Sequence, residues 1–209
     1  MKSTTDITDT RNDAAPDAFE RDALRAVARG DRAAFERLYL RHHAPLARFI
    51  SRHTARRDLI DEIINDAFWV VWRKAAEFRG DSKVGTWIIG IAYRCMLKAL
   101  RTHAPQPESS EIDSDDLLLD GAYGSGESEQ RELADWVRRG LALLPPEQRT
   151  TMELAYYLGQ SCDEIAAIMN CATGTVKARM FHARLRLRNT LPALGGDAAA
   201  SIDSRKQPL

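Results

Sequence analysis

The sequence SCDEIAAIMNCATGTVKARMFHARLRLR, residues 161–188, decides how the C-terminal part of this chain folds. It opens with a capping box, because the Ser161 hydroxyl can accept from the Glu164 amide while the Glu164 carboxylate reaches back to the start of the helix. A short apolar helix over 161–169 follows, then a turn at Asn170-Cys171-Ala172, and Thr173 can cap a longer basic helix. This order predicts a helix-turn-helix, whose second helix is available for the major groove of DNA.

The second helix of this motif has one apolar face and one basic face. At ~100° per residue, Val176, Met180, Ala183 and Leu187 fall on a single stripe. The opposite face presents Phe181 among cations, which is costly in water but suits contact with thymine methyl groups and phosphates. The alternative is an ordinary amphipathic helix whose Phe181 packs on a neighbour; the capping box, the turn and the basic helix together favour DNA binding. The outward residues and their flanking cations are Thr175, Ala178, His182, Leu185, Lys177, Arg179, Arg184, Arg186 and Arg188.

Outside this motif, apolar residues again recur at three and four positions, and the alternation typical of strands is absent. Helices are predicted at 18–29, 31–40, 45–53, 57–78 and 84–102, and then at 130–143, 146–158, 161–169 and 173–191. The sequence therefore predicts an all-α protein of two small helical domains joined by a flexible acidic linker. The predicted divisions are a disordered tail (1–17), a first domain (18–104), the linker (105–131), a second domain (132–192) and a second disordered tail (193–209).

Charge is segregated along the chain, even though its 30 Lys and Arg residues balance its 30 Asp and Glu residues. Residues 18–104 carry 17 basic and 10 acidic side chains, and residues 136–192 carry eight basic and four acidic ones. Residues 105–135 carry one basic and ten acidic side chains, among Pro, Gly and Ser residues that disfavour a packed core. Two basic blocks indicate a polyanionic partner such as nucleic acid, although a solvated surface explains the same charge equally well.

The composition excludes several classes of protein. The longest apolar run, residues 87–93, is far shorter than the ~20 residues of a membrane span, and the polar N-terminus is no secretory signal. Three cysteines without C-x-x-C spacing fit a reducing cytoplasm. The histidines, expected on the surface, show no metal-ligand spacing, and the sequence holds no nucleophile–base pair, Walker loop or dinucleotide fingerprint. We therefore expect a cytoplasmic protein that is no enzyme, has no metal or cofactor, and does not insert in a membrane.

The helix predicted at 57–78 separates an apolar stripe from a mixed acidic face. Ile60, Ile64, Ala67 and Val71 fall on the apolar side. The other side carries Trp69, and an exposed tryptophan beside carboxylates indicates a protein-docking face. Packing of Trp69 against another helix of its own domain is an equally good interpretation of the sequence. The outward face, called the Trp69 face below, consists of Asp58, Glu62, Asn65, Asp66, Trp69 and Arg73.

A basic loop punctuated by glycine, residues 78–87, leads into the next helix. Trp87 lies near the start of that helix, and Tyr93 and the cations Arg94, Lys98 and Arg101 follow. Cations and aromatic rings at the mouth of a loop suit unstacked bases that have been flipped out of a duplex. In the alternative, Trp87 fills the core and the cations are solvated; we expect Trp87 to be mostly core in either case.

These motifs resemble those of bacterial RNA polymerase sigma factors of the extracytoplasmic-function (ECF) subgroup. Region 2 of that family looks like Asp61-Glu62, Asn65-Asp66-Ala67-Phe68, Trp72, Phe78-Arg79-Gly80-Asp81-Ser82, Thr86-Trp87, Ile91-Ala92 and Arg101 of this chain. Region 4 looks like Leu141, Leu144-Pro145, Arg149, Glu164-Ile165-Ala166, Gly174-Thr175-Val176-Lys177, Arg179 and Arg184. The resemblance covers nearly all of 18–104 and 130–191, and the order and spacing of the motifs are highly specific.

The resemblance implies a function, a set of partners and a site for each partner. The protein would bind core RNA polymerase and direct it to the −35 and −10 promoter elements, under the control of an anti-sigma factor. The Trp69 face would bind the β′ clamp helices, and region 4 would also contact the β flap. The −10 element would be read and opened by Arg79, Ser82, Lys83, Thr86, Trp87, Tyr93, Arg94, Lys98 and Arg101. The −35 element would be read by Thr173, Thr175, Lys177, Ala178, Arg179, Phe181, His182 and Arg184.

The chain departs from the family at two positions, and two other interpretations stay open. Arg94 and Lys98 stand where the family often has Asn and Asp, and both add positive charge to the helix that opens DNA. They keep open a sigma-like adaptor that binds polymerase or another partner but opens no promoter. The other interpretation is a stand-alone helix-turn-helix regulator that binds duplex DNA as a dimer, which leaves the Trp69 face unexplained.

Overall fold

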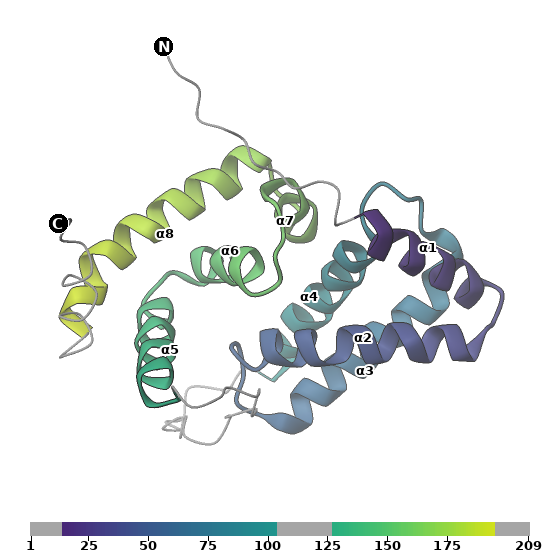
Figure 1. Ribbon diagram of the computed structural model, residues 1–209, viewed down its shortest axis with the longest axis horizontal. Coiled ribbons are helices and arrows are strands. Elements are labelled where there is room, and N and C mark those ends of the chain that lie inside the picture. Colours follow the sequence, from purple (N-terminus) through teal and green to yellow (C-terminus); the bar gives the residue numbers. More distant parts are fainter. Residues whose placement is uncertain (1–13, 104–126, 195–209) are drawn as a thin grey trace, which may run out of the picture. The chain divides into compact units, whose positions relative to one another are not determined.

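In the computed structural model, residues 14–103 and 127–194 are described, and every regular element in these two stretches is a helix (Figure 1). The described residues fall into two compact units, one before the gap and one after it, each with a hydrophobic core of its own. The prediction of an all-α fold is confirmed. Most of the predicted acidic linker, 105–131, and most of the two predicted tails lie outside the described residues.

The N-terminal unit contains α1 (Ala14–Ala28), α2 (Arg32–Ile50), α3 (Arg57–Lys74), a short 3-10 helix η1 (Ala75–Glu77) and α4 (Val84–Thr102). α3 packs along α4, and α1 packs against α2, α4 and η1. The stripe predicted in α3 is its buried face, because Ile60, Ile64, Ala67 and Val71 are at most 5% exposed. Burying each large aliphatic side chain contributes about 1.5–3 kcal/mol, so this stripe determines which face of α3 points outward.

α2 runs unbroken through Pro45, where the sequence predicts two helices, 31–40 and 45–53. A proline inside a helix removes one backbone hydrogen bond and costs about 3 kcal/mol. Leu38 and Phe49 lie on opposite sides of Pro45 along the helix, and both are at most 1% exposed. Their burial in one core keeps the helix continuous, so tertiary packing overrides the local signal for a break.

A buried carboxylate joins α1 to α2. Glu20 is 6% exposed, and its Oε1 lies 2.5 Å from Nε of Arg41 and 3.2 Å from Nε2 of His42. Burial alone would raise the pKa of Glu20. The hydrogen bonds and charges of His42 and Arg41 outweigh burial, so the pKa of Glu20 is lowered. The expectation that the histidines lie on the surface is therefore wrong for His42, which a carboxylate stabilises inside the fold, and His43 and His53 are half-buried as well.

The C-terminal unit contains α5 (Glu127–Ala142), α6 (Pro146–Tyr156), α7 (Cys162–Met169) and α8 (Thr173–Leu194). α8 packs against all three of the other helices. It approaches α5 closely because Gly140 has no side chain: a Cβ there would lie 2.5 Å from Cδ2 of Leu191. Trp136, 9% exposed, closes the same contact by donating from Nε1 to the Leu191 carbonyl at 2.8 Å.

The helix-turn-helix predicted from the sequence is formed by α7, the turn and α8. Oγ of Ser161 accepts from the Glu164 amide at 3.3 Å, and Oε2 of Glu164 accepts from the Ser161 amide at 2.8 Å, which completes the capping box. Asn170 takes the left-handed conformation of the turn, with φ of 50°. The role expected for Thr173 is corrected: it is the first residue of α8, and its hydroxyl donates to Oδ1 of Asp163 at 2.8 Å, tying α8 to α7.

Three helices extend beyond the limits predicted for the domains. α1 begins at Ala14, inside the predicted tail; α5 begins at Glu127, inside the predicted linker; and α8 ends at Leu194. The added residues include Ala14, Ala15 and Glu127, which are strong helix formers. None of the described helices is long and apolar enough to cross a membrane.

Candidate protein and nucleic-acid interfaces

The Trp69 face of α3 lies on the surface. Trp69 is 61% exposed, so the interpretation that it packs inside its own domain is wrong. The neighbouring Trp72 takes that role instead, with its ring 5.3 Å from that of Phe35 in an edge-on contact. At the start of the face, Asp58 pairs with Arg56 at 2.6 Å, and this hydrogen bond lowers the pKa of Asp58. The other members of the face, Glu62, Asn65, Asp66 and Arg73, are exposed.

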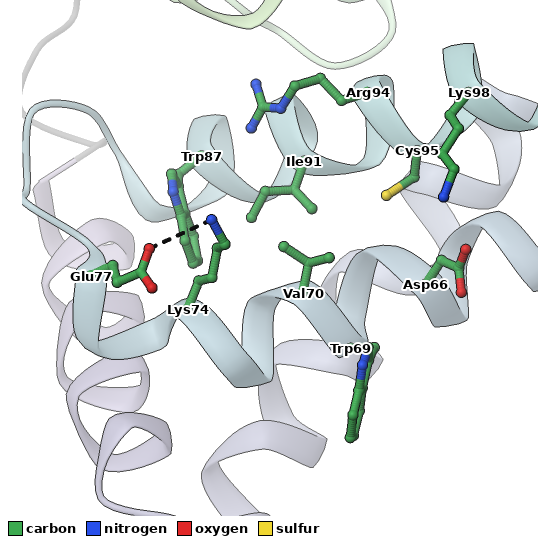
Figure 2. Close-up of a pocket in the computed structure, with 10 residues that line it drawn as sticks. All are labelled: Asp66, Trp69, Val70, Lys74, Glu77, Trp87, Ile91, Arg94, Cys95 and Lys98. Carbon is green, nitrogen blue, oxygen red and sulfur yellow. Dashed lines mark ion pairs between the residues drawn. The ribbon is translucent and has the colours of Figure 1, made fainter.

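A groove of about 550 Å³ runs between α3 and α4 (Figure 2). It brings together residues that the sequence assigns to different partners, because Asp66 and Trp69 line one side while Arg94 and Lys98 line the other. Figure 2 shows Lys98 pointing from α4 toward Asp66, and Trp69 turned away from α4 at the edge of the groove. The two predicted surfaces therefore share a border. The lining consists of Asp66, Trp69, Val70, Lys74, Glu77, Trp87, Ile91, Arg94, Cys95 and Lys98.

Cys95 contributes a thiol to this groove, and no motif in the sequence singles it out. Burial raises the pKa of the Cys95 thiol, and the nearby Asp66 carboxylate raises it further, against the opposing effect of Arg94 and Lys98. At neutral pH the group is therefore a thiol rather than a thiolate, which makes it a poor nucleophile.

The residues predicted to read the −10 element divide into a surface group and a buried group. Arg79, Lys83, Arg94, Lys98 and Arg101 are exposed, and Ser82 is half-buried. Trp87, expected to be mostly core, is half-buried: its ring lies 5.3 Å from that of Phe78 and it also lines the groove. Thr86 and Tyr93 are corrected, because they are 3% and 9% exposed and their side chains face the protein interior. They support the N-terminal unit and present almost no surface to DNA in this conformation.

The outward face of α8 is the one that the helical wheel predicts. Val176 and Ala183 are fully buried and Met180 is 9% exposed, whereas Phe181 is 63% exposed, so the interpretation that Phe181 packs on a neighbour is wrong. Leu187, expected in the stripe, is half-buried. The predicted −35 residues that are exposed together with Phe181 are Thr175, Lys177, Ala178, His182 and Arg184.

Two arginines of this face have partners on α6. Arg179 forms an ion pair with Glu147, and its side chain is only 19% exposed. Arg184 donates to the Tyr156 hydroxyl at 3.1 Å. Arg184 remains exposed, whereas Arg179 is half-buried and paired with Glu147.

Comparison with known proteins assigns both units. Residues 38–105 match the family described as Sigma-70 region 2, and residues 134–187 match Sigma-70, region 4. The ECF RNA polymerase sigma-E factor of Escherichia coli (strain K12) is 32% identical over 176 residues, which are 80% of this chain and 92% of that protein. The chain belongs to the ECF sigma factors. The RNA polymerase sigma-H factor of Pseudomonas aeruginosa is 30% identical over the same length, with 91% of that protein covered.

Two solved structures share the fold of this chain. CnrH, solved in complex with the cytosolic domain of CnrY, aligns with a TM-score of 0.63 and 23% identity over 84% of this chain and 98% of CnrH. The sigma factor RpoE, solved in complex with the anti-sigma factor NepR from Bartonella quintana, aligns with a TM-score of 0.55 and 27% identity over 76% and 96%. In this ECF sigma factor, α3 and α4 lie within region 2, α7 and most of α8 within region 4, and α1 precedes the region 2 match.

Proposed function

We propose that this ECF sigma factor binds core RNA polymerase through the Trp69 face of α3 and reads promoter DNA through two separate surfaces. It acts as a specificity subunit in the cytoplasm and has no catalytic activity of its own. The loop at residues 78–83 and the exposed cations of α4 engage the −10 element, and the outward face of α8 engages the −35 element. In this proposal the first predicted domain, 18–104, contacts polymerase and the −10 element, and the second, 132–192, contacts the −35 element.

The observation that carries the polymerase contact is the 61% exposure of Trp69 beside Asp66 on a helix whose other face is buried. Tryptophan is the side chain most often found as an energetic hot spot in interfaces, and truncating a hot spot costs at least about 2 kcal/mol. The β′ clamp helices, which the family resemblance names, are the partner that this face fits.

Association with sigma-free core polymerase tests the contact. Trp69→Ala is expected to weaken association about 30-fold, the equivalent of a 2 kcal/mol hot spot. Leu40→Ala is a matched control, because Leu40 on α2 is a large side chain that is 67% exposed and lies off the Trp69 face. Equal association of wild type and Trp69→Ala would refute the proposed face.

The DNA contacts rest on exposed cations and one exposed aromatic ring. Phe181 on α8 is flanked by Lys177 and Arg184, a combination that suits base edges and phosphates together. On α4, Arg94 and Lys98 face the groove and provide the positive charge that a melted strand needs. Transcription reconstituted with core polymerase on genomic DNA, with start sites mapped, tests both contacts.

The same experiment distinguishes a promoter-reading sigma factor from a sigma-like adaptor that opens no promoter. The observation that favours the adaptor is the positive charge of Arg94 and Lys98 where the family often has Asn and Asp. Specific start sites support the promoter-reading function, whereas polymerase association without any start site supports the adaptor. Family membership and the exposed Trp69 both speak against a stand-alone dimeric regulator.

We also propose that an anti-sigma factor controls this protein. The support is the solved complex of the sigma factor RpoE with the anti-sigma factor NepR. RpoE is 27% identical to this chain where the two align. An anti-sigma factor that covers the Trp69 face would compete with core polymerase for this protein. A binding assay in which the anti-sigma factor competes with core polymerase checks this.

A further inference from the structure

The loop at residues 78–83, which joins η1 to α4, has no regular structure of its own and yet carries two exposed cations of the proposed −10 site, Arg79 and Lys83. Fixing the backbone of one residue costs roughly 1–2 kcal/mol, so a loop that is ordered only on DNA loses affinity for every residue it must order. The structure shows what holds this loop before any DNA is bound.

α1 holds the loop at three points through two side chains. Nη2 of Arg21 donates to the Ser82 carbonyl at 3.0 Å, and the Arg21 guanidinium lies 5.7 Å from the centre of the Phe78 ring. Nε of the same arginine donates to Oδ2 of Asp17 at 2.7 Å. The other carboxylate oxygen, Oδ1 of Asp17, accepts from the Val84 amide at 3.2 Å. The contacts therefore reach Phe78 at the start of the loop, Ser82 near its end, and Val84 at the start of α4.

Gly80 shows that the loop backbone wraps closely around Arg21. Gly80 has φ of 82°, a conformation that side chains with a Cβ rarely adopt, and a Cβ there would lie 2.9 Å from Nη1 of Arg21. A side chain at this position would require the guanidinium or the loop to shift. The glycine and the arginine thus form one arrangement, built from segments about sixty residues apart in the chain.

The Asp17–Arg21 pair is only partly buried. Its side chains are 19% and 33% exposed, respectively, so it lies at the surface beside the proposed DNA contacts. The positive charge of Arg21 is already met by Asp17, which makes Arg21 a poor phosphate contact.

We propose that Asp17 and Arg21 are positioning residues for −10 recognition: they hold the 78–83 loop in the conformation that presents Arg79 and Lys83 to the promoter. This inference rests on the proposed function of that loop. It places a determinant of promoter opening in α1, which lies before the segment that matches Sigma-70 region 2. Arg21 acts through the loop and does not itself touch DNA.

The test uses the full chain with sigma-free core polymerase and a promoter found by start-site mapping. For each variant, initiation is measured on the intact promoter, on one with changed −10 bases, and on one with changed −35 bases. Arg21→Met is expected to reduce the preference for the intact −10 element about 10-fold, the effect of losing one charge-assisted hydrogen bond, while the preference for the intact −35 element stays within 2-fold of wild type. A merely destabilised protein loses activity on all three templates alike and leaves both ratios unchanged.

Two further variants sharpen the test. Arg25→Ala is the matched control, because Arg25 lies one turn along α1 in an exposed ion pair with Asp22 (3.0 Å). Asp17→Asn retains an acceptor for the Val84 amide but loses the ion pair, so it is expected to fall between wild type and Arg21→Met. It also decides the question by the same ratios if Arg21→Met does not associate with polymerase.

Each outcome has a distinct meaning. An unchanged −10 preference in Arg21→Met and Asp17→Asn, with wild type initiating normally, overturns the positioning role and leaves the proposed function intact. If start-site mapping with wild type yields no specific start site, the proposed function itself is refuted. Hydrogen exchange in the free protein gives a readout without activity: in Arg21→Met the amides of residues 79–84 are expected to exchange at least 10-fold faster while the α3 core is unchanged, and equal protection in both proteins would overturn the proposal.

Discussion

Replacing Glu147 with Gln tests whether Arg179 is released from α6 to read the −35 element. In the structure the Arg179 guanidinium pairs with the Glu147 carboxylate, and the two side chains are 19% and 69% exposed. A partly exposed ion pair is worth about 0.2–1 kcal/mol, and binding to DNA has to overcome this amount if Arg179 contacts a base or a phosphate. Glu147→Gln keeps the shape of the side chain and removes its charge, so affinity for −35 DNA is expected to rise by up to about 5-fold.

The assay is fluorescence anisotropy of a labelled −35 duplex with holoenzyme, repeated at several salt concentrations. Arg179→Ala identifies the kind of contact. Loss of a base contact costs about 1–3 kcal/mol and only on sequences with that base, whereas loss of a phosphate contact weakens all sequences and reduces the slope of log K against log salt by ~0.9. Asp135→Asn is the matched control, since it removes one carboxylate from an exposed ion pair with Arg138 on α5.

Two results would refute this reasoning. Weaker binding by Glu147→Gln would mean that the carboxylate orients Arg179 toward DNA instead of competing with DNA for it. An equal gain in Asp135→Asn would assign the effect to net charge and not to the release of Arg179.

Three shorter predictions follow from buried groups. Because the folded-state pKa of Glu20 is lowered by its two basic partners on α2, its contribution to stability is complete above its ordinary pKa of 4.5 and is lost as the pH falls through the lowered value. The free energy of unfolding, measured with urea, is therefore expected to fall more steeply with acid in wild type than in Glu20→Gln. Alkylation of Cys95 at neutral pH is expected to be slow and to accelerate in Asp66→Asn, because the carboxylate raises the thiol pKa, and labelling detected by mass spectrometry checks this. Gly140→Val is expected to destabilise the C-terminal unit by about 1–3 kcal/mol in calorimetry, since its Cβ would meet Leu191 at 2.5 Å, and an unchanged transition would show that α8 shifts without cost.

The outward faces of α3 and α8 could be predicted because helical periodicity alone determines them. Once Ile64 and Val71 are assigned to the core, the 100° step places Trp69 on the opposite side, and the same step separates Phe181 from Val176. The capping box at Ser161 could be predicted for a similar reason, since it depends on residues three apart.

The contacts between distant segments could not be predicted. Asp17 and Arg21 at positions i and i+4 have the spacing of an ordinary helical ion pair, and nothing in that spacing indicates a partner at Ser82. The break expected before Pro45 was wrong for the same reason, because a local penalty was weighed without the core that opposes it. Thr86 shows the converse error, in which a residue adjacent to a surface loop turns out to face inward.

The exposure of Trp69 and Phe181 follows from helix register, and this supports the proposal that both rings contact partners. Each ring lies on a helix whose opposite face is buried in a core. Turning either ring inward would expose that buried face to water. Folding therefore leaves both residues largely in water, 61% and 63% exposed. A partner that covers the rings removes that area from water, and because both helices are packed on a core, little conformational entropy is lost when it does.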